Sequence, residues 1–325
     1  MGSFNRSISI VTPSPLSLNG GNGRTAERYA DLLAEAGYQV EILLPDAKPR
    51  GDILVALHAR RSIEAIRNFR KIHPLGGCAV VLTGTDLYQD LPKGDPAVFE
   101  SLRTADFLVG LHRGVSSDLP MEFRNKLRVL VQSAVPPREK RRPERAKPES
   151  LVVLVPCNLR AVKNPLFPAQ ASRLLPRESR IQVFLMGEEL EEGWADKARN
   201  EEHENPRFCW IGGKPKATAL ELIAGSDVLV IPSKSEGAAN VLSEAIASGT
   251  PILASKIPGN VGILGAEPGP YFPVGDKEAL ATLLLRFERN SDFRKQLKSR
   301  VQALQGMVSP QKEREGLVAL IQDLE

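Results

Sequence analysis

The chain has 325 residues, of which 42% are hydrophobic and 25% are charged, a composition typical of a globular protein. This length exceeds what one small core needs and predicts two domains of about 150 residues each. No apolar run approaches the roughly 20 residues of a membrane span, and the N-terminal residues lack the pattern of a signal peptide. We therefore expect a cytoplasmic protein without stable membrane association.

The distribution of charge and of cysteine argues against two further classes. Residues 138–149 (REKRRPERAKPE) hold six Lys or Arg against three Glu, which accounts for +3 of the net charge of +4. Such a run, interrupted by prolines, favours a solvated linker over its alternative, a polyanion-binding patch, and we expect no nucleic-acid partner. The three cysteines are far apart and the four histidines show no i,i+4 pairing, so neither a disulfide framework nor a metal site is expected.

The N-terminal half, residues 1–137, alternates apolar strands with amphipathic helices. Residues 7–12 predict a strand, followed by a Gly-rich loop and by a helix over residues 25–36 that ends at Gly37. Further strands are expected at YQVEILL, DILVAL, AVVLTG, FLVGL and RVLVQ, with a helix at SIEAIRNFRKI.

The C-terminal half, residues 150–325, repeats this pattern. Its predicted strands are LVVLV, IQVFLM, FCWIG, VLVI and PILAS, and residues from Asp276 onward read as helices only. The alternation predicts an α/β fold of two Rossmann-like domains whose parallel sheets face a central cleft. We expect residues 138–149 to link the domains and the final helix to return toward the N-terminal domain.

The loop after VLVI has the residue types of an anion and sugar site. Glu236 lies in this loop and Glu244 in the following helix, and a carboxylate accepts paired hydrogen bonds from vicinal hydroxyls. Gly237, Ala238 and Ala239 are expected to open the helix, where free N–H groups and small side chains suit a diphosphate. The structural alternative is that Glu236 caps the helix and Glu244 lies on the surface.

Arg160 and Lys163 follow the strand LVVLV, three residues apart. An arginine forks onto phosphate oxygens and a lysine supplies a compact charge, so the pair suits a diphosphate leaving group without a metal. Taken alone, the two residues would fit a pair of solvated cations better; Glu236 and Glu244 turn the interpretation toward a ligand site.

These two clusters resemble the donor-site signature of GT-B glycosyltransferases of family 4. The shared elements are S-x-x-E-G-x(5)-S-E-A-x-A-x-G-x-P-I-x-A-S and the basic pair upstream, although Cys157 stands where a Gly is common. The resemblance implies that Glu236 contacts the donor sugar, Glu244 the ribose, and Arg160 with Lys163 the diphosphate.

A second set of stretches resembles one branch, the selenosugar synthases of selenoneine biosynthesis. It comprises Ala56–Ser62, Leu82–Asp90, Ser255–Gly265, Tyr271–Asp276 and the N-G-R-T-A stretch Asn22–Ala26. The resemblance implies that a UDP-hexose (UDP-GlcNAc or UDP-glucose) and selenophosphate are joined through a carbon–selenium bond. The UDP-sugar is then a co-substrate, and no cofactor or metal is expected.

The N-terminal half offers candidates for an anionic acceptor. Asn22, Gly23, Arg24 and Thr25 stand where the Gly-rich loop enters a helix, a place that favours anions, although the glycines equally fit a tight turn.

Five further residues follow predicted strands or lie near the donor stretch. His58 polarises or protonates a phosphate in one interpretation and is structural in the other, and Arg60 stands beside it as a candidate acceptor ligand. Asp86, with Thr85, is interpreted as holding a sugar hydroxyl, orienting a cation or capping a turn. Asn260 either binds near the donor phosphate or forms a turn.

Two other functions remain open from the residues alone. One is a family 4-like transfer of hexose to a carbohydrate or lipid hydroxyl, which needs a base. The other is a non-catalytic nucleotide-sugar-binding protein, which has no need of a complete leaving-group site. The absence of G-x-G-x-x-G after the first strand argues against a dehydrogenase.

Overall fold

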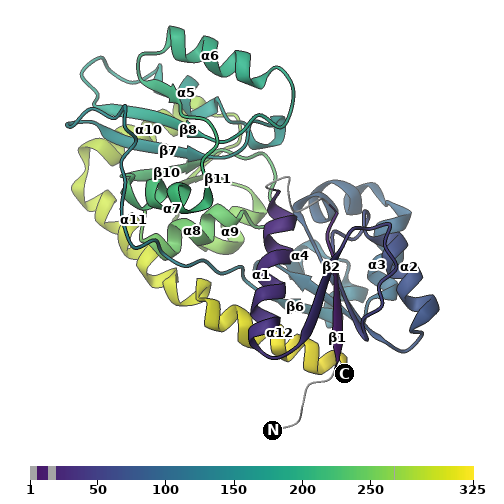
Figure 1. Cartoon of the computed structure of the whole chain (residues 1–325). Helices are drawn as coiled ribbons and strands as arrows, with labels where there is room; N and C mark the ends of the chain where they lie inside the picture. The colour runs from purple at the N-terminus through teal and green to yellow at the C-terminus, as the bar shows by residue number, and fades with distance from the viewer. Residues whose placement is uncertain (1–5, 14–19, 267) are drawn as a thin grey trace. The chain divides into compact units, whose positions relative to one another are not determined.

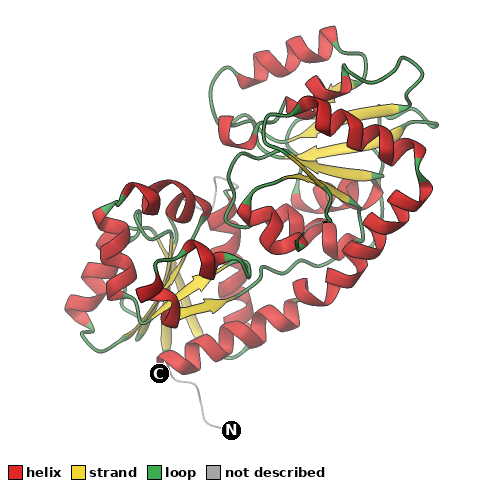
Figure 2. Ribbon diagram, turned by 180° about the vertical axis from the view of Figure 1, so that it is seen from behind, coloured by secondary structure: helices red, strands yellow, loops and turns green. Residues whose placement is uncertain are grey.

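The computed structural model describes residues 6–13, 20–266 and 268–325, and the chain divides into two compact units. The first unit contains Met1–Ser133, Glu236–Asn240 and Ser309–Glu325. The second contains Ala134–Ser235 and Val241–Val308. Both units are α/β layers with a parallel sheet between helices (Figures 1 and 2).

The sheet of the first unit is parallel throughout, with strand order β2-β1-β3-β4-β5-β6. Its strands are β1 (Ser7–Val11), β2 (Gln39–Leu43), β3 (Ile53–Leu57), β4 (Gly77–Val81), β5 (Phe107–Gly110) and β6 (Leu127–Val129). The central strands β3 and β4 are buried at every position, which is why they read as continuous apolar runs in the sequence.

Helices cover both faces of this sheet. On one face α1 (Gly21–Glu35) and α12 (Pro310–Leu324) lie side by side and bury Tyr29, Leu33 and Leu317 (Figure 1). On the other face α2 (Ile63–Ile72) and α3 (Pro96–Thr104) bury Phe69 and Leu102. The last helix of the chain therefore completes the core of the first unit.

The sheet of the second unit has the order β12-β11-β10-β7-β8-β9, again parallel. Its strands are β7 (Leu151–Pro156), β8 (Ile181–Met186), β9 (Phe208–Trp210), β10 (Val228–Ile231), β11 (Ile252–Ser255) and β12 (Tyr271–Phe272). The larger helices are α5 (Phe167–Ser172), α6 (Trp194–Glu204), α7 (Lys216–Gly225), α8 (Asn240–Ser248), α9 (Pro258–Leu264), α10 (Lys277–Arg289) and α11 (Ser291–Leu304). Phe167 and Phe272 stack at 5.9 Å between ring centroids within the core that α5 and α10 cover.

Short helical turns complete the connections of both units. They are η2 (Asp86–Asp90), η3 (Leu91–Lys93), α4 (Val115–Asp118), η4 (Met121–Lys126), η5 (Ala161–Lys163) and η6 (Gln305–Val308). No helix among the described residues combines the length and the apolar character that crossing a bilayer demands.

The predicted strands are present, but the predicted start of the first helix was wrong. Helix α1 begins at Gly21 and not at Thr25. Gly37 follows its end with a φ of 95°, as expected for a helix C-terminus. Part of the expected Gly-rich loop, residues 14–19, lies outside the described residues.

The basic segment 138–149 belongs to the second unit and is anchored there by ion pairs. Arg142 lies 3.2 Å from Asp227, and Arg141 lies 3.3 Å from Glu221. Arg145 pairs with Glu202. Three of the six basic side chains in this segment, which the sequence predicted to be solvated, are therefore paired with acidic side chains of the same unit.

Candidate active site

Each sheet has one point at which the chain reverses its direction of strand addition. In the first sheet this point lies between β1 and β3, and in the second between β7 and β10. Loops at the carboxyl ends of two such strands diverge and leave a crevice, the usual ligand site of open parallel sheets. The residues that follow β3, β7 and β10 are therefore the candidates for contact with a ligand.

In the second unit, the loops after β7 and β10 are joined by a backbone hydrogen bond. The N–H of Lys234 donates to the carbonyl of Val162 at 2.8 Å. Arg160 and Lys163, which flank the short turn η5, thus lie on a loop held against the end of β10. The structure places the predicted basic pair at this sheet's reversal point.

Arg160 also has an acidic neighbour that the sequence did not reveal. Its Nε lies 3.5 Å from Glu191, and the same carboxylate accepts a hydrogen bond of 2.7 Å from the Ala161 N–H. This backbone hydrogen bond, with the charge of Arg160, lowers the pKa of Glu191. Glu191 therefore orients the Arg160 loop while about 45% of the Arg160 side chain stays exposed.

Buried hydroxyls at the end of β10 are a second feature that the sequence analysis missed. The Oγ atoms of Ser233 and Ser235 are buried and have no hydrogen-bond partner among the described residues. A buried polar atom without a partner is costly and is common where a ligand binds. Their place directly after a strand would have identified them as candidates.

Asn260 is a fully buried residue of α9 and not part of a turn. Its Nδ2 donates to the backbone carbonyl of Ser255 at 2.9 Å and lies 3.1 Å from the Ser255 hydroxyl. Its Oδ1 is buried and has no partner among the described residues. Asn260 thereby ties the start of α9 to the end of β11.

Glu244 and Glu236 occupy different local environments. Glu244 is half-buried within α8, next to the buried residues Ser243 and Ala245. Helix α8 begins at Asn240, so the expectation that Gly237, Ala238 and Ala239 open this helix was wrong. These three residues precede the helix in irregular backbone, together with Glu236.

The reason for this backbone is a close approach between two glycines of the first unit. A Cβ atom on Gly237 would lie 2.6 Å from the backbone nitrogen of Gly84, and a Cβ on Gly84 would collide with the backbone of Gly237. The segment Glu236–Asn240 therefore packs directly on the chain after β4, which keeps residues 237–239 out of a helix.

Arg28 fixes the end of that segment. Its guanidinium donates to Asn240 at 3.1 Å and to both carboxylate oxygens of Glu313, which is 1% exposed. Glu313 also accepts a 2.8 Å hydrogen bond from the Ser133 N–H. The buried ion pair between α1 and α12 thus holds the first residue of α8.

His58 follows β3 in a strained conformation. Its φ is 72°, a region that residues other than glycine rarely adopt. Its Nδ1 lies 2.7 Å from Oδ1 of Asp86, and both side chains are almost fully buried. The Nε2 atom is buried without a partner among the described residues, which leaves one nitrogen for a ligand or a proton.

The carboxylate oxygens of Asp86 already accept hydrogen bonds from other groups of the protein. Its Oδ2 accepts from the N–H of Ala59 at 3.0 Å and from the N–H and hydroxyl of Thr83, both at 3.0 Å. Its Oδ1 accepts from the Arg60 N–H at 3.3 Å besides facing His58. A sugar hydroxyl bound by Asp86 would compete with these hydrogen bonds. The side chain of Thr85, the preceding residue, makes no hydrogen bond with the described residues.

The structure brings together three possible metal ligands that the spacing argument missed. One atom each of His58, Asp86 and Asp90 lies within 4.8 Å of the others. Asp90 is also paired with Arg60, whose Nε is 3.0 Å away. Arg60 pairs with Asp90 and backbone N–H groups donate to Asp86, so both carboxylates already have partners within the protein.

The predicted acceptor residues form the first turn of α1. Asn22, Gly23 and Arg24 lie at its N-terminus, where no described side chain caps the helix. The hydroxyl of Thr25 donates to the Gly21 carbonyl at 2.9 Å and accepts from Gln132 at 2.8 Å, so it fixes the helix start. The N-terminal end of α1 is the positive end of its dipole.

Comparison with known proteins identifies the family. The family model described as "Glycosyl transferases group 1" matches residues 137–303, just over half of the chain. This chain belongs to the group 1 glycosyltransferases. A search of curated proteins finds no match.

Solved structures show that this glycosyltransferase has the GT-B fold predicted from its sequence. Anabaena HepE in complex with UDP and glucose matches with a TM-score of 0.76 and 14% identity, over 98% of this chain and 100% of that one. Sucrose-phosphate synthase from Thermosynechococcus elongatus matches with a TM-score of 0.75 and 16% identity, over 98% and 99%. A glycosyltransferase from Rickettsia africae matches with a TM-score of 0.73 and 14% identity, over 99% of both chains.

The glycosyltransferase contains a second buried histidine, which the sequence analysis did not select. His112 accepts from the Gly114 N–H at its Nδ1 (3.2 Å) and lies 2.9 Å from the Tyr88 hydroxyl at its Nε2. Tyr88 in turn donates to Asp118 at 3.0 Å. Burial lowers the pKa of His112, so the neutral ring is the favoured form.

Proposed function

We propose that this glycosyltransferase joins selenophosphate to the anomeric carbon of a UDP-hexose and forms a seleno-sugar. The observation that supports the proposal is that Arg160 and Lys163 follow β7 on a loop hydrogen-bonded to the segment after β10, which carries the buried Ser233 and Ser235 hydroxyls, unpartnered among the described residues. Cations and hydroxyl donors together suit a diphosphate. The sequence stretches shared with selenosugar synthases supply the acceptor.

The donor half of the proposal rests on the second unit and the segment before α8. Arg160 and Lys163 would stabilise the departing diphosphate, and Glu244 and Glu236 would hold the ribose and the sugar. Structures of HepE with UDP and with UDP-glucose support the choice of a UDP-sugar, because their fold is shared. We name UDP-GlcNAc and UDP-glucose as the two donors to test.

The acceptor half rests on the first unit. The N-terminus of α1 offers backbone N–H groups, and the half-exposed Arg24 makes no ion pair with the described residues. A small dianion is held well by such charge-assisted hydrogen bonds. Arg60 would contribute less than Arg24, because its guanidinium is already paired with Asp90.

The chemistry requires one bond to form and one to break. The selenium of selenophosphate attacks the anomeric carbon, the carbon–selenium bond forms, and UDP leaves with the electron pair of the carbon–oxygen bond. Selenium is a strong nucleophile, so positioning and leaving-group stabilisation do most of the work. His58 Nε2 would hold or donate one proton on a phosphate oxygen, with Asp86 fixing the ring.

Arginine substitutions test the acceptor half. Arg24→Ala should raise the KM for selenophosphate about tenfold or more while leaving the Kd for UDP within twofold, because a charged hydrogen bond contributes about 1.5–3 kcal/mol. Arg50→Ala removes an exposed arginine before β3, at the opposite edge of the same sheet, and serves as the control. Equal KM values in Arg24→Ala and Arg50→Ala would contradict the acceptor site.

The alternative acceptor is a carbohydrate or lipid hydroxyl. Such transfer needs a general base, and His58 Nε2 is a buried nitrogen after β3 that has no hydrogen-bond partner among the described residues, whereas both ring nitrogens of His112 have partners. Faster transfer to a sugar or lipid hydroxyl than to selenophosphate would establish this alternative. UDP binding without any turnover would instead indicate a nucleotide-sugar-binding protein.

A further inference from the structure

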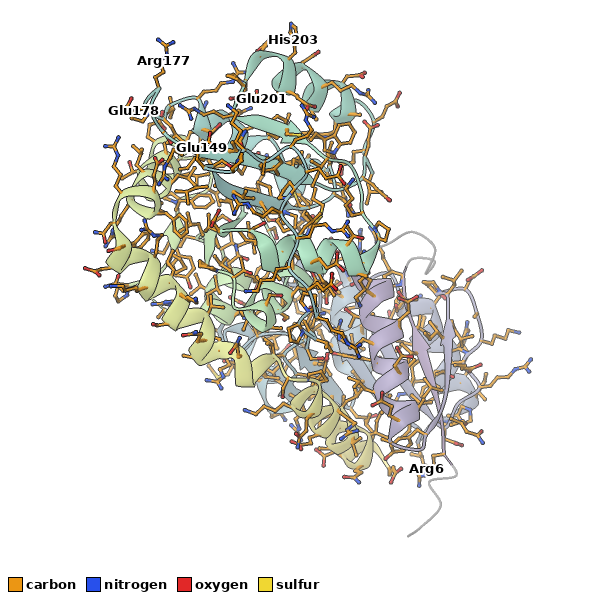
Figure 3. All side chains as sticks on the ribbon, turned by 60° about the vertical axis from the view of Figure 1, so that its left-hand side comes forward. Arg6, Glu149, Arg177, Glu178, Glu201 and His203 are labelled. Atoms are coloured by element: carbon orange, nitrogen blue, oxygen red, sulfur yellow. The ribbon has the colours of Figure 1, made fainter. Side chains whose placement is uncertain are left out.

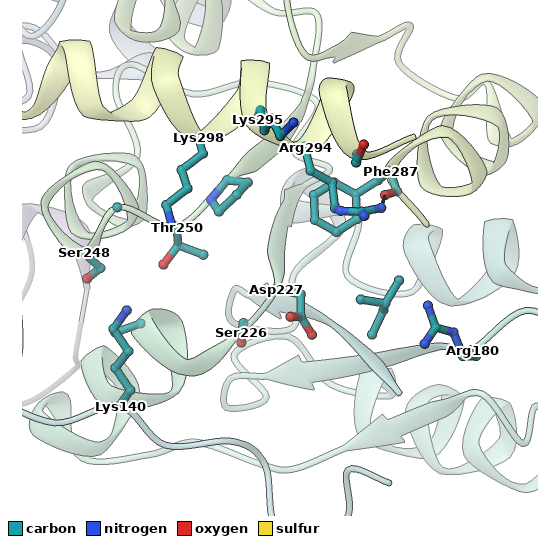
Figure 4. Close-up of a pocket in the computed structure, with 15 residues that line it drawn as sticks. Lys140, Arg180, Ser226, Asp227, Ser248, Thr250, Phe287, Arg294, Lys295 and Lys298 are labelled. Carbon is teal, nitrogen blue, oxygen red and sulfur yellow. Dashed lines mark hydrogen bonds between the residues drawn. The ribbon is translucent and has the colours of Figure 1, made fainter. Parts of the chain in front are cut away.

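The second unit has a cavity at the sheet edge opposite to the candidate donor loops. Its volume is about 530 Å³, within the range of small-molecule sites (Figure 4). The cavity is lined where β7, β10 and β11 begin, by Leu151, Asp227 and Pro251. Arg160 and Lys163 follow the other end of β7, so the cavity is separate from the donor loops.

The lining of this cavity is strongly basic. Five cationic side chains face one carboxylate: Lys140, Arg180, Arg294, Lys295 and Lys298 against Asp227. The carboxylate is already compensated, because it pairs with Arg142 at 3.2 Å and accepts a 2.7 Å hydrogen bond from the Val152 N–H. The cavity therefore carries an excess of positive charge.

Three of the cations have no acidic partner among the described residues. Lys140 and Lys298 make neither an ion pair nor a hydrogen bond there, and they extend toward one another across Thr250 (Figure 4). Arg294 donates only to backbone carbonyls, those of Phe287 and Glu288, both at 2.8 Å. No carboxylate among the described residues offsets the charge of these three groups, unlike that of Lys295, whose Nζ lies 3.2 Å from Asp292.

A hydroxyl group in the same wall also has no partner. The Oγ of Ser248 is buried and makes no hydrogen bond with the described residues. The hydroxyl of Thr250, in the same wall, donates to the Ile223 carbonyl at 3.0 Å. Phosphate oxygens accept hydrogen bonds from hydroxyl and ammonium groups. The wall offers one buried hydroxyl and two ammonium groups that have no acidic partner among the described residues.

We propose that this cavity binds a small phosphate-bearing anion. The basic wall of Lys140, Lys298 and Arg294 would hold the phosphate, and the Ser248 hydroxyl would donate to one of its oxygens. The buried ring of Phe287, together with Leu151 and Pro251, gives an apolar side that accommodates an organic group attached to the phosphate. The ligand class is an organic phosphate or an inorganic diphosphate.

The cavity has a direct structural link to the candidate donor residues. Ser248 is the last residue of α8, and Glu244 lies one turn earlier on the same helix. A ligand that contacts Ser248 therefore acts on the helix that carries the proposed ribose contact. The site is a second binding site besides the donor loops, and its existence does not depend on the identity of the acceptor.

The test is calorimetric titration with two probes, inorganic pyrophosphate and glucose 6-phosphate. It is performed on an Arg160→Ala/Lys163→Ala background, so that the donor loops do not contribute. We expect saturable binding that weakens with salt, and at least a tenfold loss in Lys140→Gln/Lys298→Gln. Both lysines are exposed, so their substitution leaves the core intact. Tighter binding of glucose 6-phosphate selects the organic phosphate, and tighter binding of pyrophosphate the inorganic one.

The matched control removes two cations of the same unit outside the cavity. Arg177 points away from the protein and Lys197 lies over the ring of Trp194 on α6, so Arg177→Gln/Lys197→Gln should bind both probes within twofold of the parent (Figure 3). Absence of binding by both probes would overturn the proposal. An equal loss of probe affinity in both double variants would also overturn it. A third contradicting result is a lowered Tm of Lys140→Gln/Lys298→Gln without any phosphate binding, because the lysines would then only complement the helix ends.

Discussion

The Nδ1 atom of His58 lies 2.7 Å from Oδ1 of Asp86, and the two side chains are almost fully buried after neighbouring strands. This pairing sets which nitrogen of the ring carries the proton and leaves Nε2 for chemistry. Asp86 also accepts three backbone hydrogen bonds, from Ala59, Arg60 and Thr83. Asp86 therefore orients the ring of His58 and also holds the loop after β3 in place.

Asp86→Asn should destabilise the protein, because an amide nitrogen cannot accept the buried N–H groups. The expected loss in free energy of unfolding is about 1–3 kcal/mol for each donor left unsatisfied, measured by urea denaturation. Asp52→Asn is the control, since Asp52 also accepts from a backbone N–H and a hydroxyl but is exposed. A loss no larger than that of Asp52→Asn would show that Asp86 is not a structural anchor.

Gly84→Ala should displace the segment that carries Glu236. The added Cβ would collide with the backbone of Gly237, where no flexible side chain can move aside. We expect a loss of about 1–3 kcal/mol in stability and a raised KM for the UDP-sugar. In Gly306→Ala the new methyl group meets nothing within 4 Å, so its KM should equal that of the parent. An unchanged KM in Gly84→Ala would separate Glu236 from donor binding.

Glu244→Gln should weaken donor binding more than catalysis. A ribose contact persists from the ground state to the transition state, so its loss raises KM and leaves kcat nearly unchanged. Steady-state kinetics with varied UDP-sugar measure both constants. A collapse of kcat at constant KM would assign Glu244 a role at the reacting centre.

Catalysis should not require a divalent cation. The carboxylates of Asp86 and Asp90 are already engaged by backbone donors and by Arg60, and the proposed leaving-group site uses Arg160 and Lys163 instead. Activity after exhaustive EDTA treatment is the measurement. Complete loss that magnesium or manganese restores would contradict this prediction and point to the His58, Asp86 and Asp90 cluster.

Stability should fall in mild acid through His112. Burial lowers the pKa of His112 below its ordinary value of 6.5, so the unfolded chain binds the proton more readily than the folded one. The stabilisation is complete above pH 6.5 and is lost as the pH falls through the folded pKa. His112→Gln should flatten the decline in Tm, whereas His203→Gln on the surface of α6 should keep it (Figure 3). An identical decline in all three proteins would assign it to other groups.

The fold was predictable because its central strands are apolar throughout and alternate with amphipathic helices. Strands such as β3 and β4 are buried on both faces, so each is recognisable in the sequence as a continuous apolar run. The candidate residues after strands were predictable for the same reason, since strand ends define the ligand edge of a parallel sheet.

What the sequence did not predict depends on contacts between distant residues. The backbone contact of Gly84 with Gly237 determines that α8 begins at Asn240, and no local pattern encodes it. The clustering of His58, Asp86 and Asp90 likewise follows from the pairing of β3 with β4, and so escaped a search for short spacings. The compensation of the basic segment by Asp227 and Glu221 is of the same kind.

The most direct test of the central claim is mass spectrometry of the products from UDP-GlcNAc and UDP-glucose, each offered with and without selenophosphate. We predict that UDP forms only when selenophosphate is present, together with a sugar that shows the isotope pattern of selenium, whether or not it keeps the phosphoryl group. Inorganic phosphate in place of selenophosphate should give no product. UDP release at the same rate without selenophosphate, or a sugar product without selenium, would contradict the account.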